Sequence, residues 1–134
     1  ERLAELTLGD PCLYVFTSGT TGLPKAAILT HERFLRGMYG YGHVCLDARA
    51  TDRIYNCLPL YHSTGLVIGF GSALLAAATM VVRRRFSASG FLQDVRETDA
   101  NVFVYVGELC RYLMAQPRRH GGGATTTAAT RSAR

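Results

Sequence analysis

The chain has 134 residues, of which 48% are hydrophobic and 19% charged, and its formal net charge is +5. This length predicts one domain, since domains run to roughly 100–200 residues, and the apolar fraction is sufficient for a buried core. The surplus charge is local, because residues 118–134 hold four arginines and no acid, which leaves the first 117 residues at +1. No basic stripe with interleaved aromatic residues is present, which predicts that nucleic acid is not a partner.

Four cysteines are widely spaced and form no CxxC pair; they are Cys12, Cys45, Cys57 and Cys110. Each stands in an apolar stretch, which predicts buried free thiols in a reducing compartment, with no disulfide framework and no metal site. The sequence begins at Glu1 rather than at Met, and it shows no signal peptide. We therefore expect an intracellular protein of which this chain is one segment.

The first informative element is the apolar run of residues 12–16, which predicts a buried strand. It leads into the string Thr17-Ser18-Gly19-Thr20-Thr21-Gly22-Leu23-Pro24-Lys25. Glycines let backbone amides approach an anion, hydroxyls donate hydrogen bonds without adding charge, and lysine supplies a compact positive charge. Lys25 is the only lysine beside 14 arginines, which favours a site that needs a point charge. We predict a phosphate-binding loop; the alternative is a Gly-rich surface turn.

This loop is not a P-loop of the Walker type. That motif needs four residues between its glycines and a Ser or Thr after its lysine. Here only two residues separate Gly19 from Gly22, and Ala26 follows Lys25. The spacing therefore excludes a P-loop NTPase.

The rest of the chain alternates between strand and helix patterns. We predict strands over residues 26–30, 53–58, 79–82 and 101–106, and a loop over 59–65. We predict helices over 31–46, 66–77 and 108–116, and one more that is capped by Ser87 or Ser89 and ends near 99. In the helix over 31–46, Tyr39 and Tyr41 are expected in the core. Near-continuous apolar strands between helices predict a parallel α/β sheet with both faces covered. Residues 118–134 have no apolar face and are predicted to be disordered.

Residues 63–82 allow a second interpretation. They contain no charge and precede three consecutive arginines (83–85), as a transmembrane helix would, and Gly65 and Gly69 form a GxxxG motif. The stretch is rich in Ala and Gly, however, and it ends in β-branched residues. We favour a buried helix, a turn and a buried strand over a membrane span, with the arginines in a solvated turn.

Two polar residues stand where predicted strands end. His62 follows Pro59-Leu60-Tyr61 after strand 53–58, and Glu108 follows strand 101–106. The carboxyl ends of parallel strands are where open α/β sheets bind ligands. His62 is thus a candidate site residue or a loop histidine bonded to the backbone. Glu108 is a ligand-side carboxylate or an acid favoured by a helix dipole.

The string 17–25 closely resembles the phosphate-binding loop of the adenylate-forming enzymes, which include acyl-CoA synthetases, luciferases and peptide-synthetase adenylation domains. The stretch Cys57-Leu-Pro-Leu-Tyr-His-Ser-Thr-Gly65 looks like the family's next motif. Phe86-Ser-Ala-Ser89 and Tyr105-Val-Gly-Glu-Leu-Cys-Arg-Tyr-Leu113 are similar to the fatty acid transport protein branch, the long- and very-long-chain acyl-CoA synthetases. The resemblance covers residues 10–117.

The resemblance implies part of a layered, parallel-sheet N-terminal domain over residues 1–117 and a two-step reaction. A fatty acid carboxylate attacks the α-phosphate of ATP, and the thiol of coenzyme A then takes the acyl group, with Mg²⁺ expected on charge grounds. It implies that the triphosphate is held by Thr17, Ser18, Gly19, Thr20, Thr21, Gly22 and Lys25. It implies a catalytic and acyl-site role for His62, while Glu108 is a substrate-side candidate from its place after strand 101–106 alone.

Several motifs of the family do not occur in this chain. The aromatic-Gly-x-Thr-Glu segment and the ribose-binding Thr-Gly-Asp are absent, and the single lysine leaves no candidate for the catalytic lysine of the C-terminal domain. The expected function is therefore that of a fragment of a long-chain fatty acid–CoA ligase. The alternative is a non-catalytic truncated remnant or a membrane-inserted segment. The resemblance leaves the parent enzyme cytoplasmic or membrane-associated, with peripheral contact to the membrane.

Overall fold

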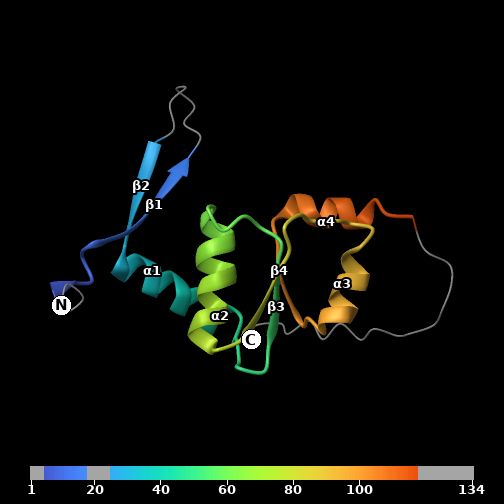
Figure 1. Cartoon of the computed structure of the whole chain (residues 1–134), viewed down its shortest axis with the longest axis horizontal. Coiled ribbons are helices and arrows are strands. Elements are labelled where there is room, and N and C mark those ends of the chain that lie inside the picture. Colours follow the sequence, from blue (N-terminus) through green and yellow to red (C-terminus); the bar gives the residue numbers. More distant parts are fainter. Residues whose placement is uncertain (1–4, 18–24, 118–134) are drawn as a thin grey trace.

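The computed structural model describes residues 5–17 and 25–117. An antiparallel hairpin of β1 (Pro11–Thr17) and β2 (Lys25–Thr30) comes first, and a three-stranded sheet between two helical layers follows (Figure 1). The elements after the hairpin are α1 (His31–Met38), the π-helical η2 (Tyr39–Cys45), β3 (Arg53–Asn56), the π-helical η3 (Thr64–Phe70), α2 (Gly71–Ala76), β4 (Thr79–Val82), α3 (Phe91–Thr98), β5 (Val102–Val104) and α4 (Gly107–Met114). Each predicted strand and helix is present, with boundaries shifted by a few residues. Loop positions 18–24 and the tail 118–134 lie outside the described residues.

The three-stranded sheet is parallel, as predicted, and has the order β4–β3–β5. Ile54 of β3 stands opposite Met80 of β4 and Val102 of β5, so the central strand is paired on both sides. Parallel strands need crossover connections, and here η3 with α2 joins β3 to β4, while α3 joins β4 to β5. This confirms the predicted α/β class.

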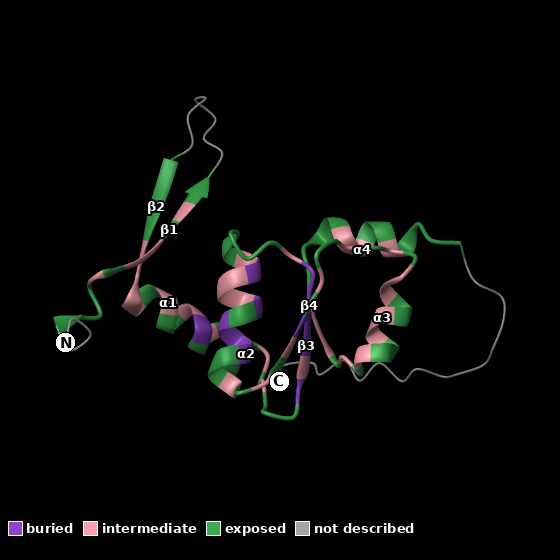
Figure 2. Ribbon diagram, in the orientation of Figure 1, coloured by how far each residue is buried: buried purple, intermediate pink, exposed green. Residues whose placement is uncertain are grey.

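Alternate residues of β3 face the two helical layers. Ile54 is fully buried with Ala73 of α2 and Val104 of β5 on one face. Tyr55 is fully buried on the other face, where its ring lies 5.4 Å from Phe91 and 5.7 Å from Phe103. Burying such a side chain is worth about 1.5–3 kcal/mol, so this strand is the centre of the core (Figure 2).

Two side chains tie the amino ends of the strands together. The Asp52 carboxylate is buried and accepts hydrogen bonds from Asn101 Nδ2 and from the Arg49 amide, both at 2.8 Å. Asn101 Oδ1 in turn accepts the Arg53 amide at 2.8 Å, and the Thr79 amide donates to the Asp52 carbonyl at 2.9 Å. Because a buried carboxylate must be satisfied, these bonds fix the register of β3, β4 and β5 where they begin.

Glycines let the α1–η2 segment cross the η3–α2 segment closely. A Cβ on Gly37 would lie 2.5 Å from a Val67 methyl carbon, and one on Gly42 would lie 3.0 Å from the Ser72 Cα. These glycines weaken helix propensity but permit the crossing. The predicted helix over 31–46 is confirmed in extent. The expectation that Tyr39 and Tyr41 are core residues is wrong: they are 55% and 45% exposed.

Residues 64–82 form a helical segment, a turn and a strand, the arrangement favoured from the sequence. Ala77 ends α2 with a left-handed φ of 52°. Within residues 5–17 and 25–117, no helix has both the length and the apolar character of a membrane span. The GxxxG glycines serve contacts inside the chain: a Cβ on Gly65 would lie 2.4 Å from the Pro59 carbonyl oxygen, and one on Gly69 would lie 2.5 Å from Asn56 Nδ2.

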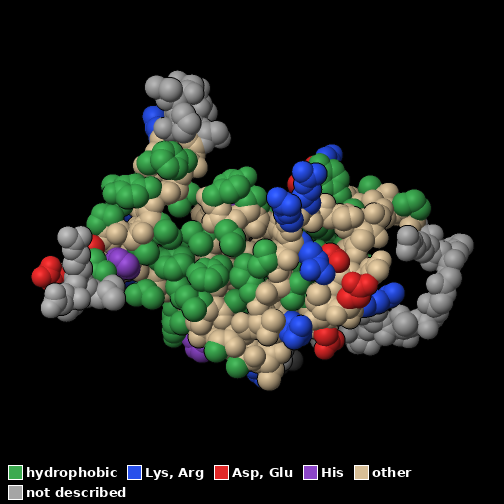
Figure 3. All heavy atoms as spheres, viewed as in Figure 1, with side chains coloured by type: hydrophobic (Ala, Val, Ile, Leu, Met, Phe, Trp, Pro, Cys, Tyr) green, Lys and Arg blue, Asp and Glu red, His purple; other side chains and the backbone are tan. Residues whose placement is uncertain are grey.

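The hairpin corrects the prediction of a buried first strand. Tyr14 of β1 stands opposite Ile28 of β2, and these side chains are 59% and 51% exposed, while Phe16 is 68% exposed. The hairpin stands beside α1 and away from the parallel sheet (Figure 1), so none of the described helices covers its outer face. Figure 3 shows the consequence, because hydrophobic side chains gather over the hairpin and the adjacent helical layer.

Burial of the thiols is also less uniform than predicted. Cys57 is buried, and burial raises the pKa of its thiol. Cys12 and Cys110 are half-buried, whereas Cys45 at the end of η2 is exposed. All four thiols are free. The apolar neighbours of Cys45 in sequence therefore did not place it in the core, because the helix turns that position outward.

Candidate functional site at the carboxyl edge of the sheet

The candidate residues His62 and Glu108 follow two neighbouring strands. β3 and β5 run parallel, so their carboxyl ends meet at one edge of the sheet. The His62 loop leaves β3 at this edge, and α4, with Glu108 in its first turn, starts there after β5 (Figure 1). The topology therefore brings both candidates to the edge at which open α/β sheets bind ligands.

His62 is held by the backbone of its own loop. Its amide donates to the Pro59 carbonyl at 3.1 Å, and its carbonyl accepts the Leu66 amide at 3.0 Å. The imidazole Nδ1 accepts the Thr64 amide at 3.3 Å. An accepting Nδ1 places the ring proton on Nε2, so the neutral imidazole presents an N–H donor from an exposed side chain. The interpretation of His62 as a loop histidine bonded to the backbone is therefore confirmed, and its site role stays a prediction.

Asn56, which the sequence pattern did not single out, bonds the loop that carries His62. Its side chain is fully buried, Nδ2 donates to the Gly65 carbonyl at 3.0 Å, and Oδ1 accepts the Leu58 amide at 3.1 Å. The sequence held one signal, since a buried amide within the predicted strand 53–58 needs a partner for both of its polar atoms. The partners themselves could not be read from the sequence.

Glu108 lies in the first turn of α4 and is exposed. Its carboxylate accepts a hydrogen bond from Arg111 Nη2, one turn later in the same helix. This bond raises the pKa of the Arg111 guanidinium. The arrangement matches the helix-acid interpretation, and it leaves the carboxylate at the carboxyl edge with one cation beside it.

Arg83 was predicted to lie in a solvated turn, but it forms a structured ion pair. It follows β4, and its Nε and Nη2 donate to the Asp94 carboxylate at 2.9 and 3.1 Å. The Tyr55 hydroxyl donates to the same carboxylate at 2.9 Å. Burial, and then this bond, raise the pKa of the Tyr55 phenol. The network joins β3, β4 and α3. The prediction that Ser87 or Ser89 caps this last helix is wrong, because its N-cap is Gly90, whose amide donates to the Ser87 hydroxyl at 3.2 Å.

The predicted phosphate loop lies mostly outside the described residues, and only its two ends are seen. Thr17 and Lys25 face each other at the end of the hairpin, and the Thr17 hydroxyl donates to the Lys25 carbonyl at 3.3 Å. Ser18, Gly19, Thr20, Thr21 and Gly22 lie outside the described residues. In Figure 1 this end of the hairpin points to the same side of the molecule as the carboxyl edge of the sheet.

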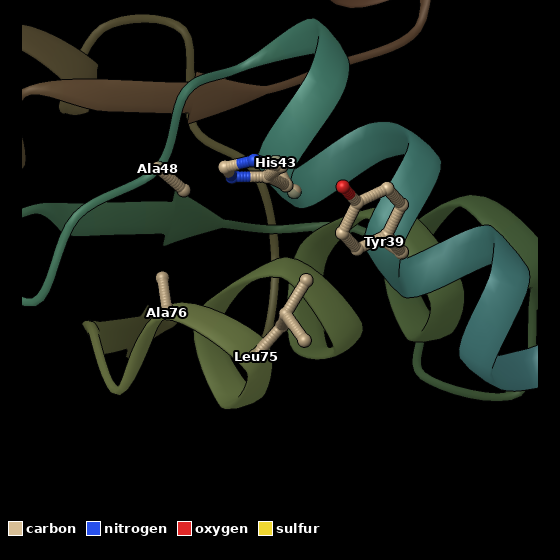
Figure 4. A pocket seen from close by; sticks show the side chains of 6 residues that line it. Tyr39, His43, Ala48, Leu75 and Ala76 are labelled. Atoms are coloured by element: carbon tan, nitrogen blue, oxygen red, sulfur yellow. The ribbon is translucent and has the colours of Figure 1, made fainter.

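A separate hollow of about 170 Å³ lies between η2 and the end of α2 (Figure 4). It is lined by Tyr39, Gly42, His43, Ala48, Leu75 and Ala76. Because α2 runs from the carboxyl edge toward the amino end of β4, its last residue Ala76 places this hollow at the opposite end of the sheet from His62. It is not part of the candidate site. Across the described part of the chain, no three metal-ligating side chains come together.

Known relatives share this sequence over most of its length. Long-chain fatty acid transport protein 1 of Homo sapiens is 49% identical over 112 residues, which are 84% of this chain and 17% of that protein. The medium/long-chain-fatty-acid–CoA ligase FadD6 of Mycobacterium tuberculosis is 44% identical over 110 residues, 82% of this chain and 18% of that protein. The chain therefore spans less than a fifth of these relatives.

The fold is shared as well. o-Succinylbenzoate CoA synthetase from Bacillus subtilis, solved with its acyl-adenylate intermediate, superposes with a TM-score of 0.73 at 25% identity, covering 88% of this chain and 33% of that one. This confirms the predicted fold, which is part of the layered α/β domain of adenylate-forming enzymes. The family model described as "AMP-binding enzyme" matches residues 1–133, and the chain belongs to this family of AMP-binding enzymes.

Proposed function

We propose that this chain carries the triphosphate-binding and acyl-side residues of a long-chain fatty acid–CoA ligase. The observation that supports this best is the pairing of Thr17 with Lys25 at the hairpin end, which points to the same side of the molecule as the carboxyl edge of the sheet. A loop closed by these residues would present hydroxyls, backbone amides and one ammonium to a polyphosphate.

In this proposal, Lys25 and the hydroxyls of residues 17–21 bind the β- and γ-phosphates of ATP. A fatty acid carboxylate oxygen attacks the α-phosphorus, and pyrophosphate leaves with the charge that Lys25 helps to neutralise. A cation about 4 Å from a phosphate oxygen contributes ~1 kcal/mol in water and ~4 kcal/mol at an effective dielectric near 20. The contribution therefore depends on how well the rest of the enzyme excludes water.

His62 would act on the acyl side of the same reaction. Its Nε2–H can donate to the acyl oxygen, on which negative charge develops when the coenzyme A thiol attacks the carbonyl carbon of the acyl-adenylate and AMP leaves. Glu108 would stand on the substrate side of the same edge. Mg²⁺ would be held chiefly by the phosphates of ATP. Enzymes that use nucleotides commonly bind Mg²⁺ through substrate phosphates and only one or two carboxylates.

The test uses a chimera in which residues 5–117 replace the matching segment of a full-length relative. Lys25→Ala should reduce ATP–pyrophosphate exchange by roughly 5- to 1,000-fold, which corresponds to a loss of ~1–4 kcal/mol. Arg36→Ala is the matched control, because it removes an exposed cation from α1, where Arg36 pairs with Glu32. Equal exchange in Lys25→Ala and in the unmodified chimera would refute the triphosphate assignment.

A further inference from the structure

Asn56 is the last residue of β3 and lies on the face of the strand that η3 covers. It is fully buried between the core and the loop that carries His62. An amide buried without hydrogen bonds costs about 1–3 kcal/mol, so its place in this strand requires partners. It has them on both polar atoms: Nδ2 bonds the Gly65 carbonyl, and Oδ1 bonds the Leu58 amide.

The two bonds join the ends of one loop. Leu58 is where the chain leaves the sheet, and Gly65 is in the first turn of η3. The residues between them, 59–64, include His62, whose amide bonds Pro59 inside the same loop. A single buried side chain therefore closes this loop at both ends, while the imidazole stands outside it.

Two glycines make room for this closure. A Cβ on Gly69 would lie 2.5 Å from Asn56 Nδ2, and a Cβ on Gly65 would lie 2.4 Å from the Pro59 carbonyl oxygen. Contacts this short are sterically forbidden, so both helical positions must be glycine for the loop to sit against the helix. The residues at 56, 65 and 69 thus form one unit, which we name the Asn56 clamp.

We propose that Asn56 is a positioning residue for His62. The clamp fixes loop 58–65, so that the Thr64 amide meets His62 Nδ1 and the Nε2–H donor is aimed from the carboxyl edge. The catalytic consequence rests on the proposed function, but the geometric claim does not, because it concerns the ring and its loop in the free chain.

The geometric claim is tested by nitrogen NMR of the His62 ring and hydrogen exchange of the Leu58 amide in this 134-residue chain. Asn56→Asp keeps the acceptor for Leu58 but turns a carboxylate oxygen toward the Gly65 carbonyl, and Gly69→Ala displaces the amide by its new methyl group. Both variants should shift the His62 ring nitrogens. Gly69→Ala, which displaces the acceptor of the Leu58 amide, should also speed Leu58 exchange by roughly tenfold or more, as expected when a local bond opens.

Two control variants separate positioning from general loss of stability. Tyr55 directly precedes Asn56 and lies on the opposite face of β3, and Tyr55→Phe removes its hydrogen bond to Asp94. Gly71→Ala crowds the same helical segment, but against Met38, whose Cγ would lie 2.5 Å from the new Cβ. Both should lower the denaturant midpoint and leave the His62 signals in place. Unchanged His62 signals in the Asn56 and Gly69 variants, or equal shifts in the controls, would overturn the proposal.

The catalytic consequence is tested in the full-length chimera. Asn56→Asp should lower acyl-CoA formation by roughly 10- to 100-fold, as small misplacements of reacting groups do, with the KM for ATP unchanged. Combined with His62→Ala, it should cost little beyond His62→Ala alone, since both changes remove the same contribution. If His62→Ala leaves activity intact, the assigned role of His62 fails while the NMR result still decides the clamp. Additive losses in the double variant would show that Asn56 acts on something other than His62.

Discussion

The Asp94 carboxylate accepts hydrogen bonds from two nitrogens of Arg83 and from the Tyr55 hydroxyl. These bonds, with Arg83 as the largest cause, lower the pKa of Asp94. A carboxyl group whose folded pKa is lowered stabilises the fold above its unfolded pKa, about 3.9, and this stabilisation is lost as the pH falls through the folded value. We expect the free energy of unfolding to decrease below about pH 4, and Asp94→Asn to flatten that decrease.

Urea unfolding at a series of pH values measures this directly. Glu97→Gln is the matched control, because it removes another carboxylate from α3 and leaves the Asp94 network intact. If the free energy of unfolding decreases below pH 4 as steeply in Asp94→Asn as in the unmodified chain, the Asp94 network does not contribute to stability.

The Tyr55 side chain combines packing with one hydrogen bond. Tyr55→Phe keeps the ring between Phe91 and Phe103 and loses only the bond to Asp94, so it should cost about 1 kcal/mol. Tyr55→Leu also loses the aromatic contacts, which add about 0.5–1.5 kcal/mol for each pair. The denaturant midpoint should therefore be lower in Tyr55→Leu than in Tyr55→Phe. A lower midpoint in Tyr55→Phe would contradict this account of the Tyr55 side chain.

At the scale of elements, the crossing of η2 over α2 depends on a glycine and a serine. A methyl group on Gly42 would press on the Ser72 backbone at 3.0 Å, so Gly42→Ala should destabilise by about 1–3 kcal/mol. Gly40 in the same π-helical segment has nothing within 4 Å, so Gly40→Ala should be neutral or stabilising by up to about 1 kcal/mol. Equal effects of the two substitutions on thermal unfolding would argue against the close crossing.

Ser72 contributes a second element-scale prediction. Its hydroxyl is buried and has no hydrogen-bond partner within residues 5–17 and 25–117. Burying such a hydroxyl without a partner costs about 1–3 kcal/mol in desolvation, and alanine has no hydroxyl to desolvate. Ser72→Ala should therefore leave the free energy of unfolding unchanged or raise it. A clear loss of stability would mean that the hydroxyl is satisfied in solution.

At the scale of the whole molecule, we expect that this chain alone does not form acyl-CoA. Positioning of both reactants supplies much of the rate of such reactions, and the chain spans less than a fifth of its curated relatives. The proposed phosphate and acyl-side residues are not accompanied in this sequence by the ribose-binding Thr-Gly-Asp of the family. Purified chain with ATP, Mg²⁺, a long-chain fatty acid and coenzyme A should give no turnover. Acyl-CoA formation that Lys25→Ala abolishes would contradict this.

The exposed hairpin face predicts how the isolated chain behaves in solution. Large apolar patches on a soluble protein promote association, and Tyr14, Phe16 and Ile28 lie on one outer face. Phe16→Ser should reduce self-association in sedimentation measurements and leave the denaturant midpoint unchanged. Ile54→Ser, at a fully buried position of β3, should instead unfold the chain. Unchanged association in Phe16→Ser would show that this face is not the contact.

Much of the architecture was determined by the sequence itself. β-Branched runs such as 79–82 and 101–106, separated by helical patterns, predicted the parallel sheet and its two covered faces. These patterns are local, because strand and helix propensities depend on neighbours a few residues away. The Gly/Thr loop and the His62 stretch indicated the family for the same reason, since a short string of residue types already specifies their chemistry.

Only the tertiary structure decided which residues meet. Residues 12–16 are apolar enough for a buried strand, yet the strand pairs in an exposed hairpin, because its burial depends on what covers it and not on its own composition. Arg83 in a basic run became a bidentate partner of Asp94, eleven residues away. Asn56 closes the His62 loop through Leu58 and Gly65, in the space that Gly69 leaves. Such contacts follow from the packing of helices on the sheet, which no local pattern encodes.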